Sequence, residues 1–114
     1  MKKDNVIYLA TDDKLTEVFL LSGGTAMKEK IGLTGKLKAM SIYEESDADG
    51  VVQTVASFKI DKEVVTSVGK AVVKVANAIA SVFEPDELLK ADITITINSK
   101  KGANGTYPVL EVEF

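Results

Sequence analysis

Between residues 35 and 60, apolar and polar residues alternate along two stretches that a short acidic segment separates. A period of two is typical of β-strands, because successive side chains of a strand point to opposite faces of the sheet. The separating segment, "EESDADG", ends in Asp49 and Gly50, a pair that suits a tight hairpin turn. The pattern therefore predicts that residues 35–43 and 51–60 form two paired antiparallel strands.

An earlier apolar run and a later change of period predict two further elements. Residues 16–21, "TEVFLL", indicate a short strand that ends at a serine and two glycines. Over residues 64–83, valine and isoleucine recur every three or four positions, which is the spacing of one face of a helix. We expect a helix of at most about five turns there, packed on the sheet. It should stop before Pro85, because the residue that precedes a proline is disfavoured in the helical region.

The C-terminal part of the chain predicts one helical turn and a second hairpin. Residues 85–90, "PDELLK", begin with a proline and an aspartate, both of which suit the start of a helix. Residues 92–97 and 107–114 alternate again and flank the segment "NSKKGANGTY". Pro108 is expected at a sheet edge or at the start of its strand, because proline cannot donate to a strand ladder.

The order of these elements predicts the fold class. Four or five strands, with one helix between the third and fourth main strands, match a small oligonucleotide-binding (OB) barrel. We therefore expect an all-β fold with one helix, a five-stranded antiparallel OB-like barrel. We expect it to form a single domain over residues 1–114, since a chain of 114 residues that is 46% hydrophobic can bury one core.

Composition narrows the classes of function. The chain contains neither cysteine nor histidine, so the best protein nucleophile and the usual base near neutral pH are both missing. We therefore expect a protein that is not an enzyme and needs no cofactor. The segment "SDADG" lacks the spacing of a calcium loop, so no metal site is expected. The short apolar runs predict neither a signal peptide nor a membrane span.

The charged residues suggest a site for anions in an acidic chain. The net charge is −3, all 14 cations are lysines, and the segment "MKEKIGLTGKLK" carries four of them with one acid. Lys36 and Lys38 are two apart on a predicted strand and so share a face, as a groove that follows a phosphate backbone requires. The alternative is a solvated strand edge that lysine protects from aggregation. The four candidates are Lys28, Lys30, Lys36 and Lys38.

Aromatic side chains accompany the lysines. Tyr43 ends the lysine-bearing strand, and Tyr107 lies near Lys100 and Lys101 in the last hairpin. Bases of single strands stack on exposed aromatic rings, and both tyrosines border polar turns, so we expect them to be accessible. Phe58, on the partner strand, is either a third stacking platform or part of the core.

The order "GLTGKLKAMSIYEESDADGVVQTVASFKIDKEVVTSVGKAVVKVANAI", followed by "ITINSKKGANGTYPVLEVEF", resembles the small single-stranded DNA-binding proteins of tailed bacteriophages, including those of protein-primed replication systems. The likeness covers residues 16–114 and is one of pattern. It associates Tyr43 with DNA stacking. Further tyrosines of that group, in the acidic turn and at the helix start, are replaced here by residues such as Ala48 and Val65.

The resemblance and the residues together predict a protein that binds single-stranded DNA without regard to sequence. It would coat and protect single strands during phage DNA replication or recombination, in the cytoplasm of the infected bacterial host. Its partners would be single-stranded DNA and replication proteins, with no membrane, and self-association is left open. The alternative is a non-enzymatic phage module that binds a host or replication protein through the same hairpin edge.

Overall fold

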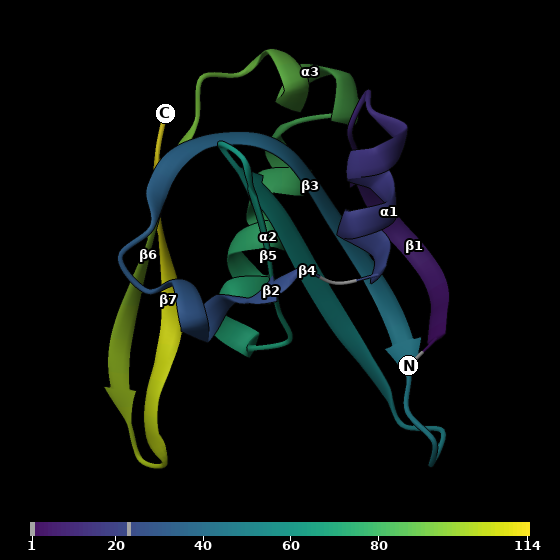
Figure 1. Ribbon diagram of the computed structural model, residues 1–114, viewed down its shortest axis with the longest axis vertical. Helices are drawn as coiled ribbons and strands as arrows, with labels where there is room; N and C mark the ends of the chain where they lie inside the picture. Colours follow the sequence, from purple (N-terminus) through teal and green to yellow (C-terminus); the bar gives the residue numbers. More distant parts are fainter. Residues whose placement is uncertain (1, 23) are drawn as a thin grey trace.

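The computed structural model describes residues 2–22 and 24–114, and the side chains from Asn5 onward within them. These residues form seven β-strands, three α-helices and one short 3-10 helix (Figure 1). In chain order they are β1 (Lys2–Ala10), α1 (Lys14–Ser22), β2 (Thr25–Ala26), the 3-10 helix η1 (Met27–Lys30), β3 (Thr34–Ser46), β4 (Val52–Ile60), β5 (Glu63–Ser67), α2 (Lys70–Val82), α3 (Pro85–Lys90), β6 (Thr94–Gly102) and β7 (Gly105–Glu113).

The strands belong to one strongly curled sheet, in which β3 is the longest member. β3 pairs antiparallel with β4 along most of its length. Its other edge is divided between β6, which pairs with residues 34–36, and β1, which pairs with residues 40–46. A strand that holds two different neighbours along one edge must bend between them. The sheet therefore curls into about half a barrel (Figure 1).

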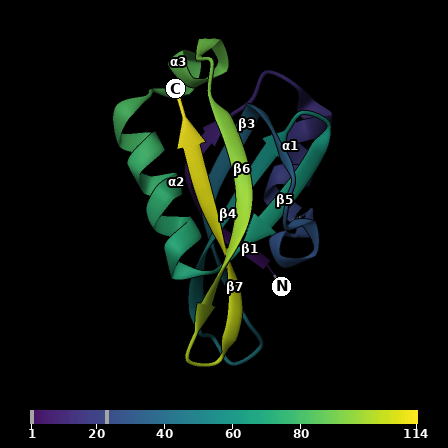
Figure 2. The ribbon, with the colours of Figure 1, turned by 90° about the vertical axis from the view of Figure 1, so that its left-hand side faces the viewer.

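Helices α2 and α1 lie on opposite sides of this sheet (Figure 2). The α2 side holds the main core, in which inward-facing residues of β3 and β4 such as Ile42 and Phe58 are fully buried. On the α1 side, the buried hydroxyl of Ser41 donates a hydrogen bond to the Leu20 carbonyl at 2.9 Å, which ties the helix to the sheet. The core cluster comprises Ala10, Met27, Leu37, Met40, Ile42, Ala56, Phe58, Ile60, Val65, Val72, Ala76, Ile79, Leu88, Ile93, Ile95 and Ile97.

Three of the elements predicted from the sequence are confirmed. β3 and β4 form the expected hairpin of residues 35–60, α3 is the expected turn at 85–90, and β6 and β7 form the C-terminal hairpin. Pro108 lies in β7, which is an edge strand, so its missing N–H group leaves the ladder to β6 intact.

The prediction of a strand at residues 16–21 is wrong, because these residues belong to α1. The carboxylate of Asp13, just before the helix, accepts hydrogen bonds from the backbone N–H of Thr16 at 3.0 Å and from its hydroxyl at 2.7 Å. This cap satisfies a backbone donor that the first helical turn leaves free. Local capping therefore outweighs the apolar run that indicated a strand.

The predicted helix over residues 64–83 is too long at its start. Residues 63–67 are β5, which pairs antiparallel with β4, and α2 begins only at Lys70. Val64, Val65 and Thr66 are β-branched and so favour the extended chain. Residues 2–10, for which the sequence pattern predicted no element, form β1.

The barrel itself also departs from the prediction. The described residues contain seven strands rather than five, β2 pairs parallel with β5, and α2 is one of three helices. The helix α2 lies between β5 and β6, which are the third and fourth strands only when the count starts at β3. The coarser expectation of a curled, mainly β fold is confirmed.

Two hairpins project from the same end of the molecule (Figures 1 and 2). One joins β3 to β4, and its residues 44–52 carry four acids and no lysine. The other joins β6 to β7, and its residues 98–107 carry two lysines and no acid. We call these segments the acidic hairpin and the basic hairpin.

Candidate nucleic-acid interface

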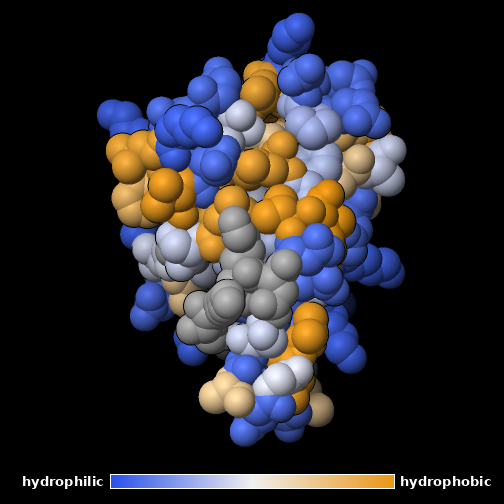
Figure 3. Space-filling view, turned by 90° about the vertical axis from the view of Figure 1, so that its right-hand side faces the viewer, coloured by the Kyte–Doolittle hydropathy of each residue, from blue (hydrophilic) through white to orange (hydrophobic). Residues whose placement is uncertain are grey.

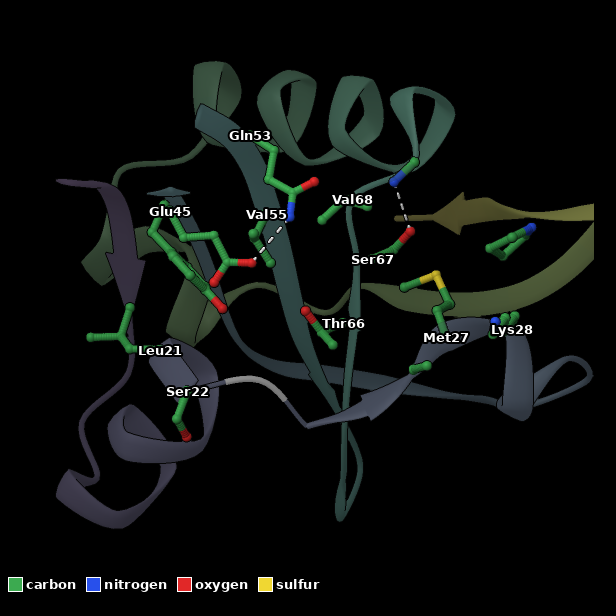
Figure 4. Close-up of a pocket in the computed structure, with 14 residues that line it drawn as sticks. Leu21, Ser22, Met27, Lys28, Glu45, Gln53, Val55, Thr66, Ser67 and Val68 are labelled. Atoms are coloured by element: carbon green, nitrogen blue, oxygen red, sulfur yellow. Dashed lines mark hydrogen bonds between the residues drawn. The ribbon is translucent and has the colours of Figure 1, made fainter. Parts of the chain in front are cut away.

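A groove of about 710 Å³ opens between the bases of the two hairpins. Figure 4 shows the side chains that line it. Tyr43 of β3, Val55 of β4 and Thr66 of β5 contribute to its floor, on the face of the sheet opposite the main core. The end of α1 and the start of η1 border it, and β7 contributes Pro108. This volume lies within the range of small-molecule and cofactor pockets, so the groove is large enough for part of a polymer.

The groove carries opposite charges on its two sides (Figure 4). On one side, Glu45 and Gln53 face each other across β3 and β4, and the Gln53 amide donates to the Glu45 carboxylate at 3.4 Å. Lys28 of η1 lies on the other side and is exposed. Ser67, between them, accepts a hydrogen bond from the Gly69 N–H at 3.0 Å. Its own hydroxyl proton can therefore be donated to a ligand.

Beside the groove, a smaller hollow of about 370 Å³ leads to the basic hairpin. The two hollows share Gly69 and Pro108, and the second adds Lys70, Ala71 and Tyr107. The first turn of α2 contains no acid, and Gly69 at its N-cap provides no side-chain cap. The partial positive charge at this helix end therefore adds to that of Lys70, and both favour an anionic group nearby.

Tyr107 is an accessible aromatic side chain on the basic hairpin, with 39% of its surface exposed. It pairs across the strands with Lys100, and its ring packs so closely on Gly102 that a side chain there would collide with it. This contact holds the ring in place while leaving part of it open for stacking. The expectation that Tyr107 is accessible is confirmed.

The structure places the predicted lysines in different surroundings. The Lys36 ammonium lies 2.6 Å from the Asp92 carboxylate, and that of Lys30 lies 3.4 Å from Glu63. The hydrogen bond and charge of Lys36 lower the pKa of Asp92 below its ordinary value. Two of the four lysines of residues 27–38 are therefore already paired with carboxylates.

Lys38 does share an exposed face with Lys36, but it lines a separate hollow with acids that include Asp12, Asp13 and Asp61. This hollow lies away from the groove. Carboxylates surround both Lys36 and Lys38, so the face of β3 that they share does not form the predicted basic path for a phosphate backbone. Of that cluster, only Lys28 lines the groove. Lys100 and Lys101 are exposed on the basic hairpin, and within the described residues neither lies at salt-bridge distance from a carboxylate.

Two of the predicted stacking platforms are buried. Phe58 is fully buried, so it is part of the core and not a stacking platform. Tyr43 is only 2% exposed, so the expectation that it is accessible is wrong. Burial and the nearby charge of Glu45 raise the pKa of the Tyr43 hydroxyl, although a hydrogen bond with Ser57 opposes this. Tyr43 supports the floor of the groove rather than offering a free ring face.

Several groove residues were not among the candidates from the sequence: Glu45, Gln53, Thr66, Ser67, Gly69 and Lys70. Glutamate, glutamine and threonine are common on any strand surface, so Glu45, Gln53 and Thr66 gave no signal. Residues 66–70 were assigned to a predicted helix that began at residue 64, which hid their place at the edge of a groove. The missed signal is Ser67 followed by Gly69, which is typical of a chain that leaves a strand and enters a helix.

A different surface of the molecule is apolar. Leu15, Val18 and Phe19 form a stripe on the solvent side of α1 and are 63%, 58% and 47% exposed. We call these three residues the α1 stripe. Figure 3 shows apolar side chains gathered on this side of the molecule. An exposed apolar cluster of this kind is common at protein–protein contacts.

Comparison with known protein families, curated protein sequences and solved structures gave no match. In residues 2–22 and 24–114, no helix is both long and apolar enough to cross a membrane. The same residues contain no cluster of three or more acidic side chains placed to hold a metal ion.

Proposed function

We propose that this protein binds single-stranded DNA in the groove between its two hairpins, without requiring a defined sequence. The strand lies across β4 and β5, its phosphates face Lys28, Lys70 and the basic hairpin, and one base stacks on Tyr107. In this proposal the protein is a binding protein and not an enzyme.

The order of elements from β3 onward supports this proposal. β3, β4, β5, α2, β6 and β7 follow one another as strand, strand, strand, helix, strand, strand, and β3 is shared between β4 and β6. We interpret this unit as an open OB-like half-barrel, to which β1, α1 and β2 are added. In OB folds the second and third strands, with the loops after the first and fourth strands, bind oligonucleotides. Those parts correspond here to β4, β5 and the two hairpins.

Charge supports the same location. All the lysines along the proposed path are exposed, and the acid-paired Lys30 and Lys36 lie outside it. A lysine without a carboxylate partner can pair with a phosphate and release the cation condensed there, which is the main source of sequence-independent affinity for nucleic acids. The chain has no arginine for bidentate contacts to guanine in a duplex groove, so preference for single strands is expected.

The observation that carries the proposal is the continuous line from the groove, past the uncapped start of α2, to Tyr107 on the basic hairpin. The resemblance to phage proteins adds a biological setting, in which the protein coats single strands during phage replication or recombination in the cytoplasm of an infected bacterium.

Fluorescence anisotropy tests this function directly. A labelled single-stranded oligonucleotide, its matched duplex and the equivalent RNA are titrated with the protein at several salt concentrations. We expect the single strand to bind more tightly than the duplex, with an affinity that falls as salt rises. The RNA arm shows whether the sugar matters. Absence of single-strand binding at low salt, or equal affinity for the duplex, would overturn the proposal.

The α1 stripe favours a second candidate function, that of a module which binds another protein through α1. An apolar contact of this type depends little on salt, whereas phosphate contacts depend on it steeply. Phe19→Asp with Val18→Asp would abolish such binding and leave the groove untouched.

A further inference from the structure

We infer that the groove contains a site that selects guanine, in which Glu45 and Gln53 read the base edge while Lys28 faces the backbone. The inference rests on the proposed function and adds a base preference to it. The groove proposed to hold a polyanion is lined by a carboxylate, that of Glu45.

Glu45 is held on the groove side of the sheet. It is two residues from Tyr43 on β3, and both therefore project from the same face, with Gln53 and Val55 opposite them on β4. A carboxylate at this place repels phosphate, so a strand that enters the groove must present something other than its backbone to Glu45. Bases carry N–H donors on their edges, and an ionised carboxylate accepts hydrogen bonds from them strongly.

The donor and acceptor pattern of the two side chains matches one base best. Glu45 offers two acceptor oxygens, and the Gln53 amide, which now donates to Glu45 at 3.4 Å, offers donors beside them. Guanine presents two neighbouring donors, N1–H and N2–H, next to the acceptor O6. Adenine presents one donor group and one acceptor, and cytosine presents one donor group and two acceptors. Thymine presents a single N–H between two carbonyl oxygens, which a carboxylate repels.

The opposite side of the groove sets the direction of the nucleotide. Lys28 lies across the groove from Glu45 and Gln53 (Figure 4). A nucleotide that places its base edge at Glu45 can therefore direct its phosphate toward Lys28 or Lys70. The positive side of the groove thus suits the phosphate of a nucleotide, and the carboxylate side suits the N–H donors of its base. A purely basic groove or a purely apolar groove would not distinguish these two parts.

Competition binding with oligonucleotides that differ at one base tests this inference. A thymine oligonucleotide with one central guanine is compared with the same strand carrying adenine, cytosine, thymine or hypoxanthine at that place. We expect the guanine strand to bind about fivefold to a hundredfold more tightly than the all-thymine strand, the range for one bidentate base contact. Hypoxanthine lacks the N2 donor and should lose most of this preference.

Two matched variants separate base reading from charge. Glu45→Gln should remove the preference for guanine, whereas Glu44→Gln, which makes the same charge change at a residue outside the groove lining, should retain it. If Glu45→Gln instead raises the affinity for every strand equally and the ratio is unchanged, Glu45 acts only by repulsion and the inference is wrong. Equal binding of all strands by the parent protein would also overturn it while leaving the proposed function intact. Absence of binding to any single strand would overturn both.

Discussion

The two hairpins are built alike and differ mainly in charge. Each joins two long antiparallel strands through a turn in which a glycine has a positive φ, 79° at Gly50 and 115° at Gly105. In the acidic hairpin, the Asp47 carboxylate accepts hydrogen bonds from the N–H groups of Asp49 and Val51, so part of its charge organises the turn. The basic hairpin has no such side-chain brace among the described hydrogen bonds, and its lysines are free for contacts.

The same backbone motif therefore carries opposite charges on the two sides of one groove. The basic hairpin can attract phosphate, and its tyrosine is exposed. The acidic hairpin repels phosphate, and Tyr43, which precedes it on β3, is buried beneath the groove. In the proposed function, a strand between them would lie with its backbone toward the basic side and its base edges toward Glu45. The position of charge, rather than net charge, would then decide how this acidic chain holds a polyanion.

The largest expected difference concerns Tyr43, which precedes the acidic hairpin, and Tyr107, which ends the basic hairpin. Tyr43→Ala should lower the free energy of unfolding by about 3 kcal/mol, because it leaves a cavity beside the sheet. Tyr107→Ala should change it little, since that ring is accessible. Urea denaturation of both variants measures the contrast. Equal stabilities would show that Tyr43 is not part of the packed structure.

Charge reversal of the basic hairpin should have the largest effect on binding. Lys100→Glu with Lys101→Glu should weaken single-strand binding and make the plot of log affinity against log salt less steep by about 0.7, the value for the one phosphate contact of Lys100, which shares the face of Tyr107. The salt-dependent anisotropy titration measures this. Lys62→Glu with Lys90→Glu is the control, because it changes the net charge equally outside the groove. If both pairs behave alike, only net charge matters.

Removal of the exposed ring should act without changing the salt dependence. Tyr107→Ala should cost about 1 kcal/mol of binding free energy, at the lower end of the range for one stacked base, because part of the ring stays packed on Gly102. Tyr107→Phe should bind like the parent, since stacking needs the ring and not the hydroxyl. A loss with Tyr107→Phe equal to that with Tyr107→Ala would indicate a hydrogen bond instead.

The smallest effect is expected at Lys36. Because its ammonium is held by Asp92, Lys36→Ala should leave the salt dependence of binding unchanged. The salt-dependent anisotropy titration measures this.

The ion pair of Lys36 and Asp92 should contribute slightly to the free energy of unfolding. The pKa of Asp92 is lowered in the folded protein, so its contribution is present near neutral pH and is lost as the pH falls through that lowered pKa. Parent and Asp92→Asn should therefore converge in stability in acid, and a constant difference at every pH would contradict this.

The sequence predicted the two hairpins because alternation and turn residues are local signals. It failed at α1, where an apolar run hid the cap that Asp13 gives to Thr16, and at β5, where β-branched residues lay within a helical spacing of valines. Three of the predicted site residues, Lys28, Tyr43 and Tyr107, lie in or beside the groove.

The remaining site predictions depended on contacts between distant parts of the chain. The pairing of Lys36 with Asp92 joins residues 56 positions apart. The depth at which Tyr43 and Phe58 lie depends on which helix covers each face of the sheet. Neither fact can be obtained from local spacing, because both are decided by tertiary packing.

Nuclear magnetic resonance titration locates a bound strand on the protein residue by residue. A ¹⁵N-labelled sample is titrated with a thymine oligonucleotide that carries one central guanine, and amide shifts are followed along the chain. If the strand lies in the groove, we expect the largest shifts on residues 66–70 and on the basic hairpin, and none on the α1 stripe. Shifts centred on the α1 stripe, or on Lys36 and Lys38, would contradict it.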